Sequence, residues 1–120
     1  MMIELCNGSL KLGLVPSLGG SVSHFRMGDI DLMRPLSTDA LRQNVRGAVM
    51  FPMAPYANRI AGNAFSFSGE VWRFIANNPL ERFNVHGTGW QSAWDIKEHK
   101  ANEVVPRQNF IRTEDALSSP

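Results

Sequence analysis

The sequence predicts an all-β protein built as an antiparallel β-sandwich. Two stretches, Leu10–Val15 and Phe65–Phe74, alternate apolar and polar residues with the period of two that is typical of half-buried strands. Turn-forming pairs such as Asn7-Gly8 and Gly28-Asp29 separate the apolar stretches at short intervals. Short strands joined by such turns favour a sandwich over a helical or mixed fold.

The first third of the chain contains four expected strands. Ile3–Cys6 and Leu10–Val15 form a hairpin around Asn7-Gly8, because this dipeptide tolerates the left-handed backbone of a tight turn. Ser21–Met27 alternates again and predicts a third strand. After a Gly-Asp turn, Ile30–Met33 predicts the fourth.

The middle of the chain predicts three further elements. Ser37–Gln43 places capping residues before helix formers, which favours a short helical turn. Gly47–Phe51 is continuously apolar and predicts a strand buried on both faces. Phe65–Phe67 and Val71–Phe74 predict a hairpin around Ser68–Glu70. Their aromatic residues are interpreted as cross-strand pairs on one buried face rather than as platforms for sugar stacking.

The composition changes after residue 97. Residues 1–97 are expected to form one domain, whereas residues 98–120 are polar and contain only two apolar pairs. This second stretch is expected to be a loosely ordered tail.

Composition and charge exclude several classes of partner. The chain has 120 residues, of which 43% are hydrophobic and 19% charged, and its formal net charge is +1. This balance provides no electrostatic field for nucleic acid or for an anionic membrane. No run approaches the roughly 18 apolar residues of a membrane helix. Cys6 has no second cysteine to pair with and is expected to be buried and inert, so we expect a reducing, cytoplasmic location.

The sequence contains no motif for a metal or a cofactor. It has no phosphate-binding or dinucleotide-binding glycine motif, and His24, His86 and His99 do not cluster with Cys6 in the sequence. We therefore expect neither a metal nor a cofactor. His24 is interpreted as a half-exposed strand residue, since nothing beside it in the sequence would tune its pKa.

The segment Phe51–Gly62 is predicted to be an ordered loop with a polar centre. Its two prolines remove two backbone donors, so the segment does not continue a sheet. Tyr56, Asn58 and Arg59 place an aromatic hydroxyl, an amide and a guanidinium between apolar residues that would anchor the loop. This pattern favours a binding surface. The alternative is a structural crossover in which Arg59 caps carbonyl groups or pairs with a carboxylate.

A second polar candidate lies in the stretch His86–Trp90. The glycines on both sides of Thr88 allow the backbone to approach a ligand closely. Trp90 and Trp94 would either line a pocket or pack in the core. His86 is therefore a stronger candidate for ligand binding than His24.

These motifs together resemble a known family. In order and spacing, the chain is similar over residues 3–97 to the N-terminal third of the aldose 1-epimerase (galactose mutarotase) family. The resemblance rests on several separate motifs, which makes it more specific than any single one. They are Pro55–Ile60, Gly62, Phe65–Phe67, Asn77-Asn78-Pro79, His86-Gly87 and Trp90.

The resemblance implies a fold, an activity and a set of binding residues. The fold would be the large antiparallel β-sandwich of the galactose mutarotase-like type, incomplete in this chain. The activity would be the interconversion of α and β anomers of a hexose such as glucose or galactose. Asn58, Arg59 and His86 correspond to the residues that hold the sugar hydroxyls.

The catalytic groups are expected to be absent. In the family a histidine acts as acid and a glutamate as base, and both belong to segments beyond the matched region. We therefore expect a truncated, catalytically incomplete member of this isomerase family, with no catalytic residue of its own. The alternatives are a non-catalytic carbohydrate-binding or regulatory module and a folding remnant without a ligand.

Overall fold

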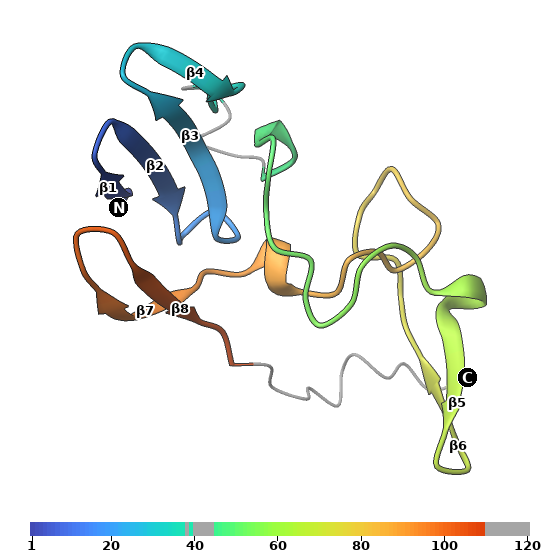
Figure 1. The fold of residues 1–120 in the computed structure, drawn as a ribbon. Coiled ribbons are helices and arrows are strands. Elements are labelled where there is room, and N and C mark those ends of the chain that lie inside the picture. Colours follow the sequence, from blue (N-terminus) through green and yellow to red (C-terminus); the bar gives the residue numbers. More distant parts are fainter. Residues whose placement is uncertain (38, 40–44, 110–120) are drawn as a thin grey trace. The chain divides into compact units, whose positions relative to one another are not determined.

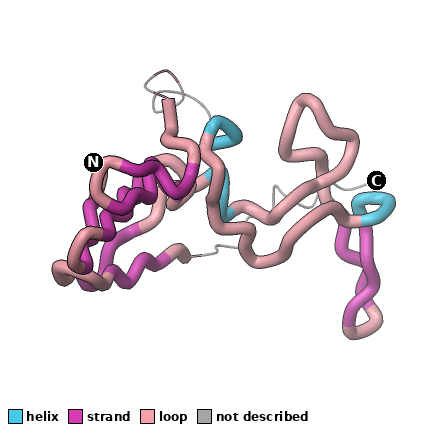
Figure 2. Tube along the Cα trace, turned by 45° about the horizontal axis from the view of Figure 1, so that its top comes forward, coloured by secondary structure: helices cyan, strands magenta, loops and turns pink. Residues whose placement is uncertain are grey.

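The computed structural model describes residues 1–37, 39 and 45–109 and contains only β-strands, 3₁₀ turns and loops in this part (Figures 1 and 2). Within the described residues, eight strands form three antiparallel sheets. The chain divides into two compact units. The first comprises Met1–Pro52 and Thr88–Gln108, and the second is built around Met53–Gly87. The all-β prediction is therefore confirmed.

The first unit contains a four-stranded sheet in the order β1-β2-β3-β4, as the sequence predicts (Figure 1). The strands are β1 (Ile3–Asn7), β2 (Leu10–Val15), β3 (Ser21–Met27) and β4 (Ile30–Met33). Because side chains alternate across a strand, the row Leu5, Leu12 and Phe25 shares one face of the sheet. The row Glu4, Gly13 and His24 shares the other.

The turn between β1 and β2 lies one residue later than predicted. Asn7 pairs with Leu10, so the two-residue loop is Gly8-Ser9 rather than Asn7-Gly8. Gly8 has a φ of 60°. A glycine with positive φ at the first loop position suits the right-handed twist of the two strands.

Two residues on the polar face of the sheet differ in burial from what the sequence predicts. His24 is 8% exposed rather than half exposed, and its Nε2 donates to Glu4 at 3.2 Å while Nδ1 lies 3.1 Å from Ser23 Oγ. Gly13 leaves room for the imidazole, since a Cβ there would lie 2.4 Å from His24 Cε1. Cys6 is exposed rather than buried, because it shares this polar face on the edge strand β1.

Glu4 interacts with both Lys11 and His24 on this face of the sheet. Partial desolvation raises the pKa of its carboxyl group, but the charge of Lys11 at 3.4 Å and the hydrogen bond from His24 outweigh that effect. The pKa of Glu4 is therefore lower than its ordinary value.

The segment after the sheet contradicts the prediction of a buried strand over Gly47–Phe51. Val45–Gly47 is a 3₁₀ turn (η1), and Val49 and Met50 are 46% and 53% exposed. A continuous apolar run does not by itself distinguish a strand from another buried element. Here the carbonyl of Met50 accepts a hydrogen bond from the N–H of Val22, but the segment forms no strand. The helical turn expected over Ser37–Gln43 falls mostly outside the described residues.

A hairpin of β7 (Asp95–His99) and β8 (Val104–Arg107) completes the first unit. The backbone N–H of Cys6 donates to the carbonyl of Ala101 at the hairpin turn, at 2.7 Å. The predicted start of a loosely ordered tail at residue 98 therefore falls inside β7. Proline at 106 and few apolar residues conceal this strand pair in the sequence.

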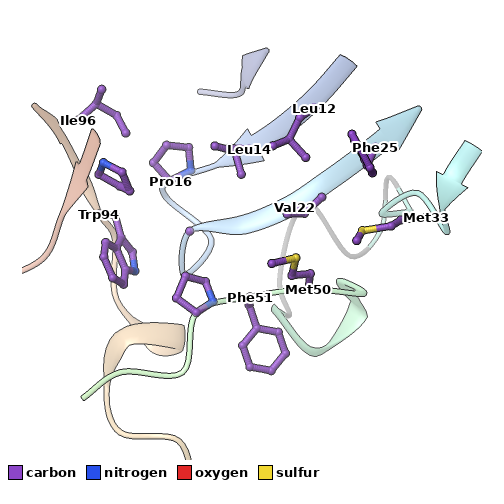
Figure 3. A pocket seen from close by; sticks show the side chains of 13 residues that line it. Leu12, Leu14, Pro16, Val22, Phe25, Met33, Met50, Phe51, Trp94 and Ile96 are labelled. Atoms are coloured by element: carbon purple, nitrogen blue, oxygen red, sulfur yellow. The ribbon is translucent and has the colours of Figure 1, made fainter. Parts of the chain in front are cut away.

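The apolar face of the sheet borders a hollow of about 520 Å³ (Figure 3). Figure 3 shows that side chains from the sheet, from residues 50–52 and from the β7–β8 hairpin surround this hollow. The lining is almost entirely apolar. It consists of Leu12, Leu14, Pro16, Gly20, Val22, Phe25, Met33, Met50, Phe51, Pro52, Trp94, Ile96 and Pro106.

The second unit contains the hairpin of β5 (Ala64–Phe67) and β6 (Glu70–Arg73). Ser68 and Gly69 both have positive φ, which is the geometry of a type I′ turn and confirms the predicted hairpin. The expected burial of its aromatic face is wrong. Phe65 and Phe67 are 45% and 66% exposed, although the Phe65 ring stacks on that of Phe74 with 5.5 Å between the ring centroids.

Gly19 predicts a measurable packing constraint in the first unit. Gly19 and Gly28 both have positive φ, 61° and 57°, but a Cβ at Gly19 would lie 2.1 Å from the carbonyl oxygen of Trp90, whereas Gly28 has nothing within 4 Å. Gly28→Ala should lower the free energy of unfolding by about 1–2 kcal/mol through backbone strain alone. Gly19→Ala should cost about 1–3 kcal/mol more because the backbone of Trp90 must move. Urea denaturation followed by circular dichroism tests this, and equal losses would contradict it.

Candidate functional site

The predicted loop packs against the stretch that contains His86. In the second unit, Ala54 bridges Gly87 and Arg59 bridges Val85 as isolated β-bridges rather than as part of a strand. The loop interpretation of Phe51–Gly62 is therefore confirmed up to the short 3₁₀ turn η2 (Ala61–Asn63). This pairing connects two segments that carry all three predicted binding residues.

Asn58 and His86 contact each other directly, although 28 positions separate them in the sequence. The backbone N–H of His86 donates to the carbonyl of Asn58 at 2.9 Å, and the backbone N–H of Asn58 donates to His86 Nδ1 at 2.9 Å. Both residues have positive φ, 69° and 60°. Because Nδ1 accepts this bond, a neutral imidazole carries its proton on Nε2.

Arg59 extends the cluster through Glu81. Its Nε donates to Glu81 Oε2 at 2.9 Å, its Nη2 donates to the other carboxylate oxygen, and its Nη1 lies 3.4 Å from Asn58 Oδ1. The hydrogen bonds from Arg59 lower the pKa of Glu81, with a further contribution from His86, and the same bonds raise the pKa of Arg59. Asn58, Arg59 and His86 thus lie together, and a concave shape around them stays a prediction.

Asn77 holds the backbone on both sides of His86. Its side-chain amide donates to the carbonyls of Val85 at 2.8 Å and Gly87 at 2.9 Å, and its oxygen accepts from the N–H of Val85 at 2.8 Å. A single side chain therefore fixes the residues before and after His86. This role is not visible in the sequence, where Asn77 is only part of a turn signature.

Tyr56 has a structural contact. Its hydroxyl donates to Asn84 Oδ1, and the amide of Asn84 donates to the carbonyl of Ile75 at 2.8 Å. Burial raises the pKa of Tyr56. The hydroxyl of Tyr56 therefore connects the loop to Asn84.

The pairing of Arg59 with a carboxylate was the alternative interpretation of the loop, but the sequence analysis did not identify Glu81 as its partner. Its sequence neighbourhood contains a turn but no arginine at a spacing that suggests an ion pair, and 22 positions separate it from Arg59. Among the described residues, the structure contains no group of three histidine, cysteine, aspartate or glutamate residues arranged for a metal. The same part of the chain contains no helix long and apolar enough to cross a membrane.

Comparison with known proteins identifies the family. The family model described as aldose 1-epimerase matches residues 1–115. The chain belongs to the aldose 1-epimerase family. It is also 33% identical over 100 residues to the uncharacterized protein YphB of Escherichia coli K12, covering 83% of this chain and 33% of that one.

Solved structures agree with this assignment. A putative aldose 1-epimerase from Escherichia coli K12 superposes with a TM-score of 0.80 and 26% identity, over 92% of this chain and 38% of that one. A galactose mutarotase related enzyme from Lactobacillus acidophilus superposes with a TM-score of 0.70 over 98% of this chain and 35% of that one, and at 11% identity this shows the fold alone. The chain thus spans about a third of the length of the relatives it matches.

Asn77 generates the first prediction for the site. Asn77→Ala removes all three bonds to the backbone around His86 and leaves buried polar groups without partners, at about 1–3 kcal/mol each before water compensates. Thermal unfolding should occur at a clearly lower temperature, and the amide NMR resonances of Val85 and Gly87 should shift. Asn102→Ala, in the exposed β7–β8 turn, is the matched control. A stability loss no larger than that of the control would contradict this role.

Glu81 generates a prediction about pH. In the folded chain its pKa lies below the ordinary value of 4.5, so its carboxylate stabilises the fold above that pH, and this contribution disappears as the pH falls through the lower folded-state value. Carbon-detected NMR titration should show Glu81 titrating below its ordinary range. Arg59→Met should move the titration upward, and Arg73→Met, at an exposed position of β6, should not. An unchanged titration in Arg59→Met would show that Arg59 does not lower the pKa of Glu81.

Proposed function

We propose that this chain supplies the sugar-binding part of an aldose 1-epimerase active site, in which Asn58, Arg59 and His86 hold the hydroxyl groups of a hexose. The observation that carries the proposal is the convergence of these three residues from segments 28 positions apart. Their side chains combine a guanidinium donor, an amide that both donates and accepts, and an imidazole with its proton on Nε2.

A sugar is the ligand that suits this combination. Each hydroxyl of a pyranose both donates and accepts hydrogen bonds, so its recognition needs donors and acceptors fixed at neighbouring positions. A site built in this way discriminates because an analogue lacking a hydroxyl leaves a polar group without a partner, which costs roughly 1–3 kcal/mol. Membership of the aldose 1-epimerase family supports a sugar substrate.

The chemistry of mutarotation needs more than binding. The pyranose ring opens when a base removes the proton of the C1 hydroxyl and an acid protonates the ring oxygen, and it recloses after rotation about the C1–C2 bond. Because this chain spans about a third of its relatives' length, we propose that the acid and the base belong to the part of the family fold outside it. Groups that bind the sugar equally before and during ring opening do not lower the barrier.

Hexose binding tests the proposal. Titration calorimetry of the 120-residue protein with D-galactose and D-glucose should detect binding of at least one sugar, and Arg59→Lys should weaken it about tenfold because the planar fork is lost. Arg73→Lys, at an exposed position of β6, should leave the affinity unchanged. No binding of any aldohexose by the folded wild-type protein would overturn the proposal.

Polarimetry tests the catalytic part. Freshly dissolved α-D-glucose or α-D-galactose should reach equilibrium at the same rate with the 120-residue protein as in buffer, because removing an acid or a base typically costs roughly 10²–10⁴-fold each. Acceleration in proportion to protein concentration that Arg59→Ala or His86→Ala abolishes would place catalytic groups within this chain. Binding without acceleration in a stable, isolated chain would instead fit a carbohydrate-binding or regulatory module.

A further inference from the structure

We propose that Glu81 is a positioning residue that sets which edge of the Arg59 guanidinium faces the sugar. The inference rests on the proposed function, because it concerns how the binding side chain of Arg59 is oriented. It assigns a role to a residue that belongs to neither of the two binding segments, the loop around Arg59 and the stretch around His86.

The contacts of Arg59 define this orientation. The Glu81 carboxylate occupies the Nε and Nη2 edge of the guanidinium with two hydrogen bonds, one to each oxygen. Two parallel bonds fix the plane of the group as well as its position. The opposite edge, with Nη1, points to Asn58 Oδ1 at 3.4 Å. Arg59 therefore presents its Nη1 side next to the amide of Asn58.

Glu81 is the better anchored partner of the pair. Its side chain is 25% exposed, compared with 49% for Arg59. Its backbone N–H donates to the carbonyl of Asn78 at 3.0 Å, and Asn78 itself is buried and accepts from the N–H of Leu80 at 3.1 Å through its side chain. A carboxylate on such a turn holds a long, flexible arginine, which otherwise loses rotamer freedom when a ligand binds.

Charge balance supports the same role. Glu81 neutralises Arg59, and His86 lies near enough to lower the pKa of Glu81 further. The facing charged groups of this cluster are thus Arg59 and Glu81, and His86 is the titratable group beside them. A paired guanidinium approaches neutral hydroxyls with a smaller desolvation cost than an isolated cation.

A purely structural role is the competing explanation. In that case the ion pair would only connect the loop to the turn, and loss of Glu81 would weaken sugar binding only as far as it destabilises the fold. The two explanations differ in whether the effect of Glu81 passes through the guanidinium of Arg59. A double-mutant cycle separates them.

The experiment compares four proteins for affinity: wild type, Glu81→Gln, Arg59→Lys and the double variant, with Glu70→Gln on the exposed start of β6 as the control. Glu81→Gln should weaken hexose binding about tenfold, and Glu70→Gln should not change it. In the Arg59→Lys background, Glu81→Gln should have less than about a twofold further effect. Equal losses in both backgrounds, or a wild-type affinity in Glu81→Gln, would overturn the inference.

A second measurement needs no sugar and separates this inference from the proposed function. The Nε–H resonance of Arg59 should be resolved and slowly exchanging in the wild type, should persist in Glu81→Asp and should broaden in Glu81→Gln. If the wild type binds no hexose, the proposed function fails, and this resonance still decides whether Glu81 orients Arg59. An unchanged resonance in Glu81→Gln would refute the orienting role.

Discussion

The cluster of polar residues depends on one constraint, which is that the backbone of the loop around Arg59 must find hydrogen-bond partners outside a regular sheet. Two prolines remove donors from this segment, and isolated bridges to residues 85 and 87 replace a continuous ladder. Side chains supply the remaining partners. His86 Nδ1 accepts from the backbone N–H of Asn58, and Asn58 Oδ1 accepts from the backbone N–H of Arg59.

This arrangement connects the fold to the chemistry. The same backbone bonds that hold the loop also fix the tautomer of His86, because the N–H of Asn58 occupies Nδ1. Arg59 is held by a carboxylate from a third segment, so the side chains of His86 and Arg59 owe their orientation to residues distant in the sequence. The first unit has a different character, with an apolar hollow against its sheet and a buried histidine that is hydrogen-bonded on its polar face.

Strands and hairpins followed from the sequence wherever local chemistry decided them. Alternation and turn residues indicated β1 to β6 nearly to the residue, since both signals act within a few positions. The burial of individual side chains could not be predicted from the sequence in the same way. His24 is buried rather than half exposed, because Gly13 in the neighbouring strand leaves room for its ring. Cys6 is exposed rather than buried, because it lies on the polar face of an edge strand. A run such as Gly47–Phe51 carries no information about which backbone groups will pair with it.

The sequence by itself determined the all-β class, the family resemblance and the residue types of the candidate site, because motifs and periodicity are properties of neighbouring positions. Only the tertiary structure decided that Asn58 contacts His86, that Glu81 pairs with Arg59 and that Asn77 supports both sides of His86. These contacts join residues 8 to 28 positions apart. Their partners are chosen by how the loops fold back on one another, which no local pattern in the chain specifies.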